Sequence, residues 1–242
     1  MSGRQYFAYR SFWPELMTVR KFAESGVDSV VVFPANTLNS LGEPYSKYPA
    51  NWRWFDTYDF APVAQQFNDI LEVNPETKFL CMVDLNSPVW LSRQLSLGHN
   101  ASDSFTELTQ ALCNPAWRGA VKNYLRNFLV YCEEYFPDAI VSYILACGHT
   151  DEWLDHSAGA ASPAKAEAYR RWRKNNCMPP AEIPSADSLN AVEFDDLLHD
   201  PATASGILEY WRFTNETVSG TIADFAAETR KFKREKIEVG VF

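Results

Sequence analysis

Short apolar runs that favour strands alternate along this chain with longer stretches whose apolar residues repeat at helical spacing. Five runs rich in β-branched and aromatic residues predict strands, at residues 5–10, 28–33, 78–84, 139–147 and 236–242. The third run, KFLCMVD, is almost wholly apolar, as expected for a strand that is covered on both faces. Strands that alternate with helices are typical of a parallel sheet built from β/α units.

Helices are predicted between these strands, and proline often marks where they begin. The clearest helical pattern consists of Phe60, Val63, Ala64, Phe67, Ile70 and Leu71. The other predicted helices open at Pro14, Asn114-Pro115, Ser162-Pro163 and Asp200-Pro201. Residues 34–58 and 86–113 are predicted to form long loops, and residues 178–199 an irregular insertion. Long ordered loops in compact domains are usually functional.

The number of strands decides the predicted fold. The chain has 242 residues, close to the roughly 250 residues of a complete TIM barrel, but only five strands can be counted, and the long loops use the remaining length. We therefore predict an α/β fold of the (β/α)8 TIM-barrel type with only its first five strands present. It forms one catalytic-barrel region over residues 1–242 that stops within strand five. Open sheet edges invite association, so we expect an unstable chain or a homo-oligomer.

Composition and charge argue against nucleic acids and membranes as binding partners. The 22 Lys and Arg residues against 31 Asp and Glu residues give a formal net charge of -9, which disfavours a nucleic-acid partner. No apolar run approaches the roughly 20 residues that cross a bilayer, so we expect no membrane partner. A soluble protein is predicted, located in the cytoplasm or, after removal of a signal peptide, in the periplasm or outside the cell.

The cysteines and the absence of certain short motifs argue against several kinds of cofactor and catalytic site. The five cysteines are scattered and contain no C-x-x-C pair, which favours reduced, structural thiols. No phosphate-binding glycine motif follows a strand, so no nucleotide cofactor is predicted, and no cofactor of any other kind. No G-x-S-x-G motif is present either, which disfavours a serine hydrolase.

Functional residues of parallel β/α folds collect at the carboxyl ends of the strands. In this chain these ends carry mainly carboxylates, amides and indoles, at Arg10, Phe12, Trp13, Asn36, Asn39, Asp84, Asn86, Trp90, His149, Asp151, Glu152 and Trp153. Carboxylates and amides pair with hydroxyl groups, and indole rings stack on the apolar face of a sugar. The set therefore predicts a neutral, polyhydroxylated ligand.

Two other interpretations of the segment after the fourth strand stay open. His149, Asp151 and Glu152 could form a metal site, although their spacing is not that of a common zinc site. Asp151 and Glu152 could also cap a helix or lie in a solvated loop, which is the usual fate of acidic residues before a helix.

Several segments of the chain resemble a known enzyme family. They are GHTDEW at 148–153, SPAKAEAYRRW at 162–172, YDF at 58–60, NP at 74–75, DLNSPVW at 84–90 and VGVF at 239–242. Together they are similar to the retaining glycoside hydrolases of clan A, and most like the family 42 β-galactosidases and their relatives. The resemblance spans nearly the whole chain.

The resemblance implies a retaining β-glycosidase that hydrolyses a β-galactoside or a related oligosaccharide. In this family a glutamate at the end of strand four is the general acid/base, and Glu152 matches it. The nucleophile is a second glutamate at the end of strand seven, which would lie beyond Phe242. We therefore expect the chain alone to be inactive. The two carboxyl groups of a retaining enzyme lie about 5–5.5 Å apart.

The resemblance also implies which residues contact the substrate. The predicted substrate-binding residues are Asp151, Trp153, Asp84, Asn86, Trp90, Arg10 and Asn36, with Trp90 and Trp153 as platforms for sugar rings. Asp151 departs from the family, which has asparagine at this position, and the cysteines do not reproduce the zinc site of many family 42 enzymes. The alternatives are a noncatalytic carbohydrate-binding protein and a metal-dependent hydrolase on the same barrel.

Overall fold

The core of the fold is a parallel sheet of five strands that follow one another in chain order. The computed structural model describes residues 7–11, 14–39, 42–97, 108–148, 151–155, 162–191 and 199–242. The strands are β1 (Ala8–Arg10), β2 (Ser29–Val32), β5 (Lys78–Asp84), β6 (Ile140–Ala146) and β7 (Glu238–Val241). They pair in the order β1-β2-β5-β6-β7, and every pairing is parallel. The predicted α/β fold with five parallel strands is therefore confirmed.

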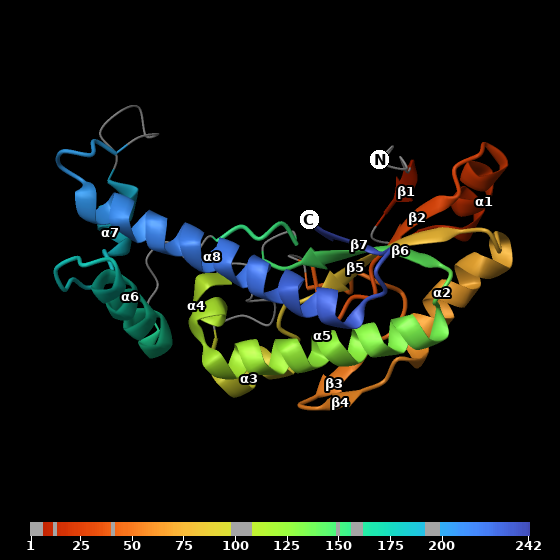
Figure 1. Ribbon diagram of the computed structural model, residues 1–242, viewed down its shortest axis with the longest axis horizontal. Helices are drawn as coiled ribbons and strands as arrows, with labels where there is room; N and C mark the ends of the chain where they lie inside the picture. The colour runs from red at the N-terminus through yellow and green to blue at the C-terminus, as the bar shows by residue number, and fades with distance from the viewer. Residues whose placement is uncertain are drawn as a thin grey trace.

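Helices cover one face of this sheet (Figure 1). The main helices are α1 (Leu16–Glu24), α2 (Ala61–Val73), α5 (Pro115–Tyr135) and α8 (Ser205–Phe232). Strand residues alternate between the faces, so Val30, Phe79 and Tyr143 join the large core beneath the helices. The opposite face holds a smaller cluster around Val31 and Met82, to which none of the described helices contributes.

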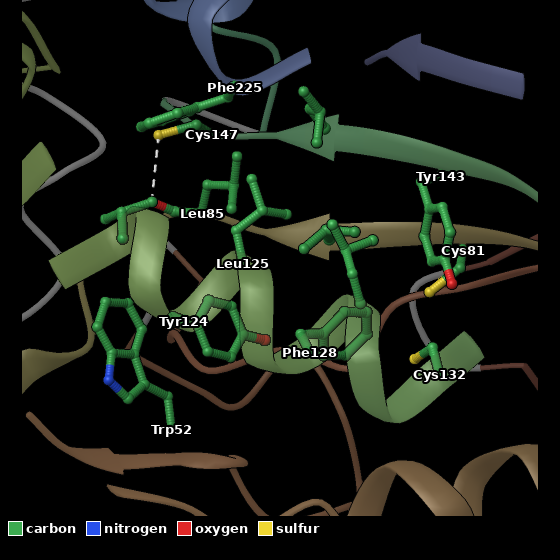
Figure 2. Close-up of a cluster of buried hydrophobic side chains, with 14 of the residues drawn as sticks. Trp52, Cys81, Leu85, Tyr124, Leu125, Phe128, Cys132, Tyr143, Cys147 and Phe225 are labelled. Atoms are coloured by element: carbon green, nitrogen blue, oxygen red, sulfur yellow. Dashed lines mark hydrogen bonds between the residues drawn. The ribbon is translucent and has the colours of Figure 1, made fainter. Parts of the chain in front are cut away.

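Helix α5 supplies much of the large core (Figure 2). Tyr124, Leu125, Phe128 and Cys132 project from it into the core between helix and sheet and are fully buried. Its start follows the sequence signal, because the Asn114 side chain accepts hydrogen bonds from the backbone N–H groups of Ala116 and Trp117. All five cysteines are unpaired, and burial raises the thiol pKa of Cys81, Cys132 and Cys147.

The long loops contain elements that the sequence pattern did not predict. Residues 34–58 include a hairpin of β3 (Trp52–Trp54) and β4 (Thr57–Tyr58), whose Trp52 ring stacks on Tyr124 at 4.7 Å between centroids. Residues 86–113 include α3 (Val89–Leu95) and α4 (Leu108–Cys113). The hairpin forms because Trp52 gains a buried place against α5, a tertiary contact that local periodicity does not encode.

A second, smaller core forms beyond the sheet. Helices α6 (Pro163–Asn175) and α7 (Ala186–Asn190) pack against the first part of α8 through Tyr169, Leu189, Tyr210 and Phe213. The Arg173 guanidinium holds this lobe together, since it contacts a Glu209 carboxylate oxygen at 2.7 Å. Figure 1 shows the lobe projecting away from the sheet. Helix α8 begins at Ser205, four residues after the predicted Pro201, because residues 201–203 form a turn instead.

The sheet curves toward the face that the helices leave open. Arg10 ends β1 and Phe242 follows β7, and the guanidinium carbon of Arg10 lies 4.1 Å from the centroid of the Phe242 ring. A flat sheet with strands about 4.8 Å apart would hold these two strands about 19 Å apart. The two side chains meet because this face is concave. In the described part of the chain, β1 and β7 remain edges and the sheet does not close into a barrel.

No helix within the described residues combines the length and the apolar character that crossing a bilayer requires.

The two edge strands lead to a prediction about association. We expect the 242-residue chain to self-associate, because an unpaired strand edge offers backbone groups to another chain. Val241 on β7 is 47% exposed, and Val241→Lys should reduce association by placing a charge on that edge. Light scattering after size exclusion measures the mass. Val130→Lys, on the exposed face of α5, is the control and should leave association unchanged. A monodisperse wild-type monomer that unfolds cooperatively would contradict the prediction.

Candidate functional site

Asp84, the last residue of the central strand, organises the carboxyl edge of the sheet. Its side chain is fully buried. One oxygen accepts hydrogen bonds from the backbone N–H of Asn36 at 2.7 Å and from the Thr37 hydroxyl at 2.9 Å. The other accepts from the backbone N–H of Asn86 at 3.0 Å. Asp84 thereby fixes the chain that leaves β2 and the chain that leaves β5.

Asn86 carries this network across to the end of β6. Its Nδ2 donates to Oδ1 of Asp151 at 2.8 Å, and its Oδ1 accepts from the backbone N–H of Gly148 at 2.8 Å. Asp151 is fully buried, and its Oδ2 has no hydrogen-bond partner among the described residues. Asn86 thus donates to both carboxyl groups, to Asp84 from its backbone N–H and to Asp151 from its side-chain amide.

Burial perturbs the titration of both carboxyl groups. Loss of hydration raises the pKa of Asp84, and the three hydrogen bonds that it accepts oppose this rise. Burial also raises the pKa of Asp151, which rises further because of the negative charge of Asp84. The nearby Arg10 and the hydrogen bond from Asn86 act in the opposite direction on Asp151. Asp151 is therefore the group of this pair that most readily keeps its proton.

Tyr45 and Arg10 lie near the carboxyl groups of Asp84 and Asp151 on the concave face. Burial, and to a smaller extent the charges of Asp151 and Asp84, raises the pKa of Tyr45, whose ring packs edge-on against Phe33. Arg10 reaches the same region from β1 and lies over the Phe242 ring. Tyr45, Thr37 and Phe242 were not predicted as site residues. The long loop after the second strand was predicted to be functional, but no local pattern distinguishes Tyr45 within it.

The backbone around Glu152 is unusual. Gly148, Asp151 and Trp153 have φ values of 84°, 66° and 59°. The left-handed region costs a residue other than glycine about 1–2 kcal/mol, and such strain clusters at functional sites. The backbone N–H of Trp153 donates to the Cys147 carbonyl at 2.6 Å, which closes a tight loop. Glu152 is exposed at the head of this loop, beside the buried Asp151.

The two tryptophans predicted as sugar platforms lie elsewhere. Trp153 is 5% exposed, and its indole N–H donates to the Leu145 carbonyl at 3.0 Å. Its ring belongs to the core beneath the helices, because the positive φ values on either side of Glu152 turn it away from the concave face. We therefore correct its placement from a sugar platform to a core residue. Trp90 is half-buried, and its indole N–H donates to the Trp52 carbonyl.

Trp90 belongs to an aromatic cluster at the β3–β4 hairpin. Its ring centroid lies 4.8 Å from that of Trp54 and 5.1 Å from that of Phe55, and both of these residues are partly exposed. Asn36 links this cluster to the carboxylates, because its Oδ1 accepts from the backbone N–H groups of Asn51 and Trp52. The structure therefore brings together five of the predicted residues, Arg10, Asn36, Asp84, Asn86 and Asp151. Glu152 lies next to them in the chain, and Trp90 is connected to Asn36 through Trp52.

The metal interpretation of the segment after β6 includes His149. His149 lies outside the described residues, as do Phe12 and Trp13. Within the described ranges, no three His, Cys, Asp or Glu side chains form a group that could hold a metal ion.

The raised pKa of Asp151 predicts how stability depends on pH. The folded state keeps a proton that the unfolded state loses above the ordinary aspartate pKa of about 3.9, so the free energy of unfolding falls as pH rises from there. The slope for one such proton is at most about 1.4 kcal/mol per pH unit. We expect Asp151→Asn to flatten this dependence and to stabilise the protein more at pH 8 than at pH 5. Urea denaturation across this range measures it.

The control for this change is an aspartate on the surface. Asp138 is exposed, and Asp138→Asn should leave the pH profile of stability unchanged. An identical profile for Asp151→Asn and the wild type would show that Asp151 is ionised in the folded protein.

Gly148 provides a test of the tight loop. A Cβ at this position would lie 3.0 Å from the Cα of Trp153, at a φ of 84°. Gly148→Ala should therefore lower the free energy of unfolding by at least about 1–2 kcal/mol. Gly119, in the middle of α5, has open space around a Cβ, so Gly119→Ala should stabilise the protein by about 0.5–1 kcal/mol. Equal stability of the two variants in urea denaturation would disprove the strained loop.

No protein-family model matches this chain, and no curated protein is significantly similar to it.

Proposed function

We propose that this chain is part of the catalytic barrel of a retaining β-glycosidase that acts on a β-galactoside or a related oligosaccharide. The observation that carries the proposal is the group of carboxyl and amide side chains at the carboxyl edge of a parallel sheet, with the exposed Glu152 beside it. Functional sites of parallel β/α folds form at this edge. The sequence resemblance to clan A glycoside hydrolases supports the same function.

The arrangement of the sheet supports the barrel part of the proposal. Successive parallel strands lie side by side, helices cover one face, and the opposite face is concave. A barrel sector has these three properties, because each β/α unit is wound in the same direction around a common interior. In the proposal, strands from outside the described residues pair with β1 and β7 and close the barrel.

Glu152 is proposed as the general acid/base. Its side chain is exposed, so a substrate can reach it, whereas Asp151 is enclosed. In the first step the acid gives its proton to the leaving oxygen while a nucleophile attacks the anomeric carbon. In the second step the resulting carboxylate takes a proton from a water molecule that attacks the anomeric carbon, and the bond between this carbon and the nucleophile breaks.

The buried residues are proposed to position the site. Asp84 already accepts three hydrogen bonds from the protein, and the Asn86 side chain is used by Gly148 and Asp151. We therefore propose that Asp84, Asn36 and Asn86 hold the strand ends in place. Arg10 and Tyr45 are proposed to face the sugar from the concave side.

The proposed reaction needs a second carboxylate near Glu152. Among the described glutamates on α8, Glu216 pairs with Arg212, and Glu228 pairs with Arg126 and Lys231. The third, Glu209, pairs with Arg173. The resemblance places the nucleophile after a seventh strand, so the proposal takes it from outside the described residues. Because the three glutamates of α8 are held in ion pairs, a second candidate function is also favoured. It is a noncatalytic carbohydrate-binding protein that uses the same edge of the sheet.

Replacement of Glu152 tests the proposal. Hydrolysis of 4-nitrophenyl β-D-galactoside by the full natural polypeptide should fall about 10²–10⁴-fold in Glu152→Gln, the range attributed to general acid/base catalysis. Added azide should restore turnover of this substrate, because the anion attacks the glycosyl intermediate without a general base. Glu76→Gln removes an exposed glutamate just before β5, at the opposite edge, and should keep wild-type activity.

The outcomes separate the two candidates. Wild-type activity in Glu152→Gln would exclude Glu152 as the acid/base. Calorimetric binding of galactosides without hydrolysis by the wild type would favour the noncatalytic binding protein.

A further inference from the structure

A groove runs from the segment after Glu152 along α8. Its volume is about 800 Å³, within the usual range of ligand sites. One wall is formed by residues 153–155 and the other by one side of α8. The groove therefore begins at the residue that follows Glu152 in the chain, on the carboxyl side of β6.

Exposed apolar side chains face the groove from both walls. Leu154 is 46% exposed on the first wall, and Trp211 is 38% exposed on the second. Trp211 is held from behind, because its ring packs edge-on against His199 at 4.8 Å between centroids. The indole of Trp211 is thus fixed in orientation and partly open, which suits stacking on the apolar face of a sugar ring.

The polar side chains of the groove suit a neutral ligand. The charges of Arg212 and Glu216 compensate each other through an ion pair of 2.7 Å. Asn215 and Ser219 add an amide and a hydroxyl, which both donate and accept hydrogen bonds. No uncompensated positive charge among these four side chains would attract a phosphate or a sulfate, whereas hydroxyl groups find partners of both kinds.

The α8 wall is fixed before any ligand binds. Glu216 also accepts a hydrogen bond from the indole N–H of Trp172 on α6, at 2.6 Å. The Arg212 guanidinium carbon lies 5.8 Å from the centroid of the same indole. Side chains that are already ordered lose little conformational freedom on binding, which favours affinity.

We propose that this groove binds the sugar units of a β-linked oligosaccharide on the leaving-group side of the cleaved bond. The inference rests on the proposed function, since it uses Glu152 as the acid. A general acid lies within hydrogen-bond reach of the leaving oxygen, so the proposal places the units attached to that oxygen near Glu152, which directly precedes the first lining residue of the groove in the chain. The substrate class is therefore an oligosaccharide, in which several linked units bind in addition to the sugar at the carboxylates.

Chain-length dependence of binding tests this inference. The probes are galactose and β-1,4-galacto-oligosaccharides of two to four units, titrated calorimetrically into the full natural polypeptide carrying Glu152→Gln to prevent hydrolysis. We expect affinity to rise with length and Trp211→Ala to weaken tetrasaccharide binding about tenfold, a change of about 1.4 kcal/mol. Galactose binding should be unchanged. The control is Tyr135→Ala, which removes an aromatic side chain 59% exposed at the far end of α5.

A second variant, Arg212→Ala, tests the groove even if Trp211→Ala does not fold. The Arg212 side chain is 57% exposed, so Arg212→Ala should fold normally, and it should weaken tetrasaccharide binding without affecting galactose.

Each result has a distinct meaning. Equal affinity for all lengths, or no effect of Trp211→Ala and Arg212→Ala in folded protein, would overturn the groove while leaving the glycosidase intact. Length-dependent binding that is sensitive to Trp211, together with no hydrolysis by the enzyme with Glu152 intact, would support the groove and reject the glycosidase. No binding of any probe would overturn both.

Discussion

The buried carboxylate of Asp84 is the interaction on which the site depends. It lies at the end of the central strand, and its two oxygens accept hydrogen bonds from residues that follow β2 and β5. Backbone N–H groups at strand ends have no ladder partner, and an unsatisfied buried donor costs about 1–3 kcal/mol. Asp84 satisfies two of these donors at once. Asn36 is thereby held where its side chain can anchor the hairpin, and Asn86 where its side chain can reach β6.

A second carboxyl group, that of Asp151, lies on the far side of Asn86, and its burial is unfavourable. It lies close to the negative charge of Asp84 and has an oxygen with no partner among the described residues. The backbone at Asp151 and Trp153 is also strained. Such costs persist only where the surrounding structure imposes them. Here the imposing contacts are the Trp153 indole in the core and the backbone hydrogen bond to Cys147, which together leave Glu152 exposed at the head of the loop.

The lobe of α6, α7 and the first part of α8 extends this arrangement beyond the sheet. Its own core, centred on Tyr169 and Phe213, keeps α8 straight past the point where it leaves the sheet. That extension places Trp211 opposite Leu154. An insertion between β6 and β7 thus gives a five-stranded sheet a groove wall that the β/α units alone would not supply.

The sequence by itself determined the five parallel strands, the longer helices between them, the caps at Asn114 and Ser162, and the edge where polar residues gather, because periodicity and capping are local. It did not determine the short helices α3, α4 and α7, the last of which lies in the segment predicted to be irregular. Only the tertiary structure decided what those residues face. Strict alternation along an extended chain would place the side chains of Asp151 and Trp153 on the same side of the sheet. In the structure the carboxyl group of Asp151 lies near Asp84, whereas the indole of Trp153 lies in the core beneath the helices. The hairpin that contains Trp52, and the position of Tyr45 near both carboxylates, were likewise decided by contacts between distant segments. Burial and positive φ are properties of the folded chain, and no local pattern of residue types encodes them.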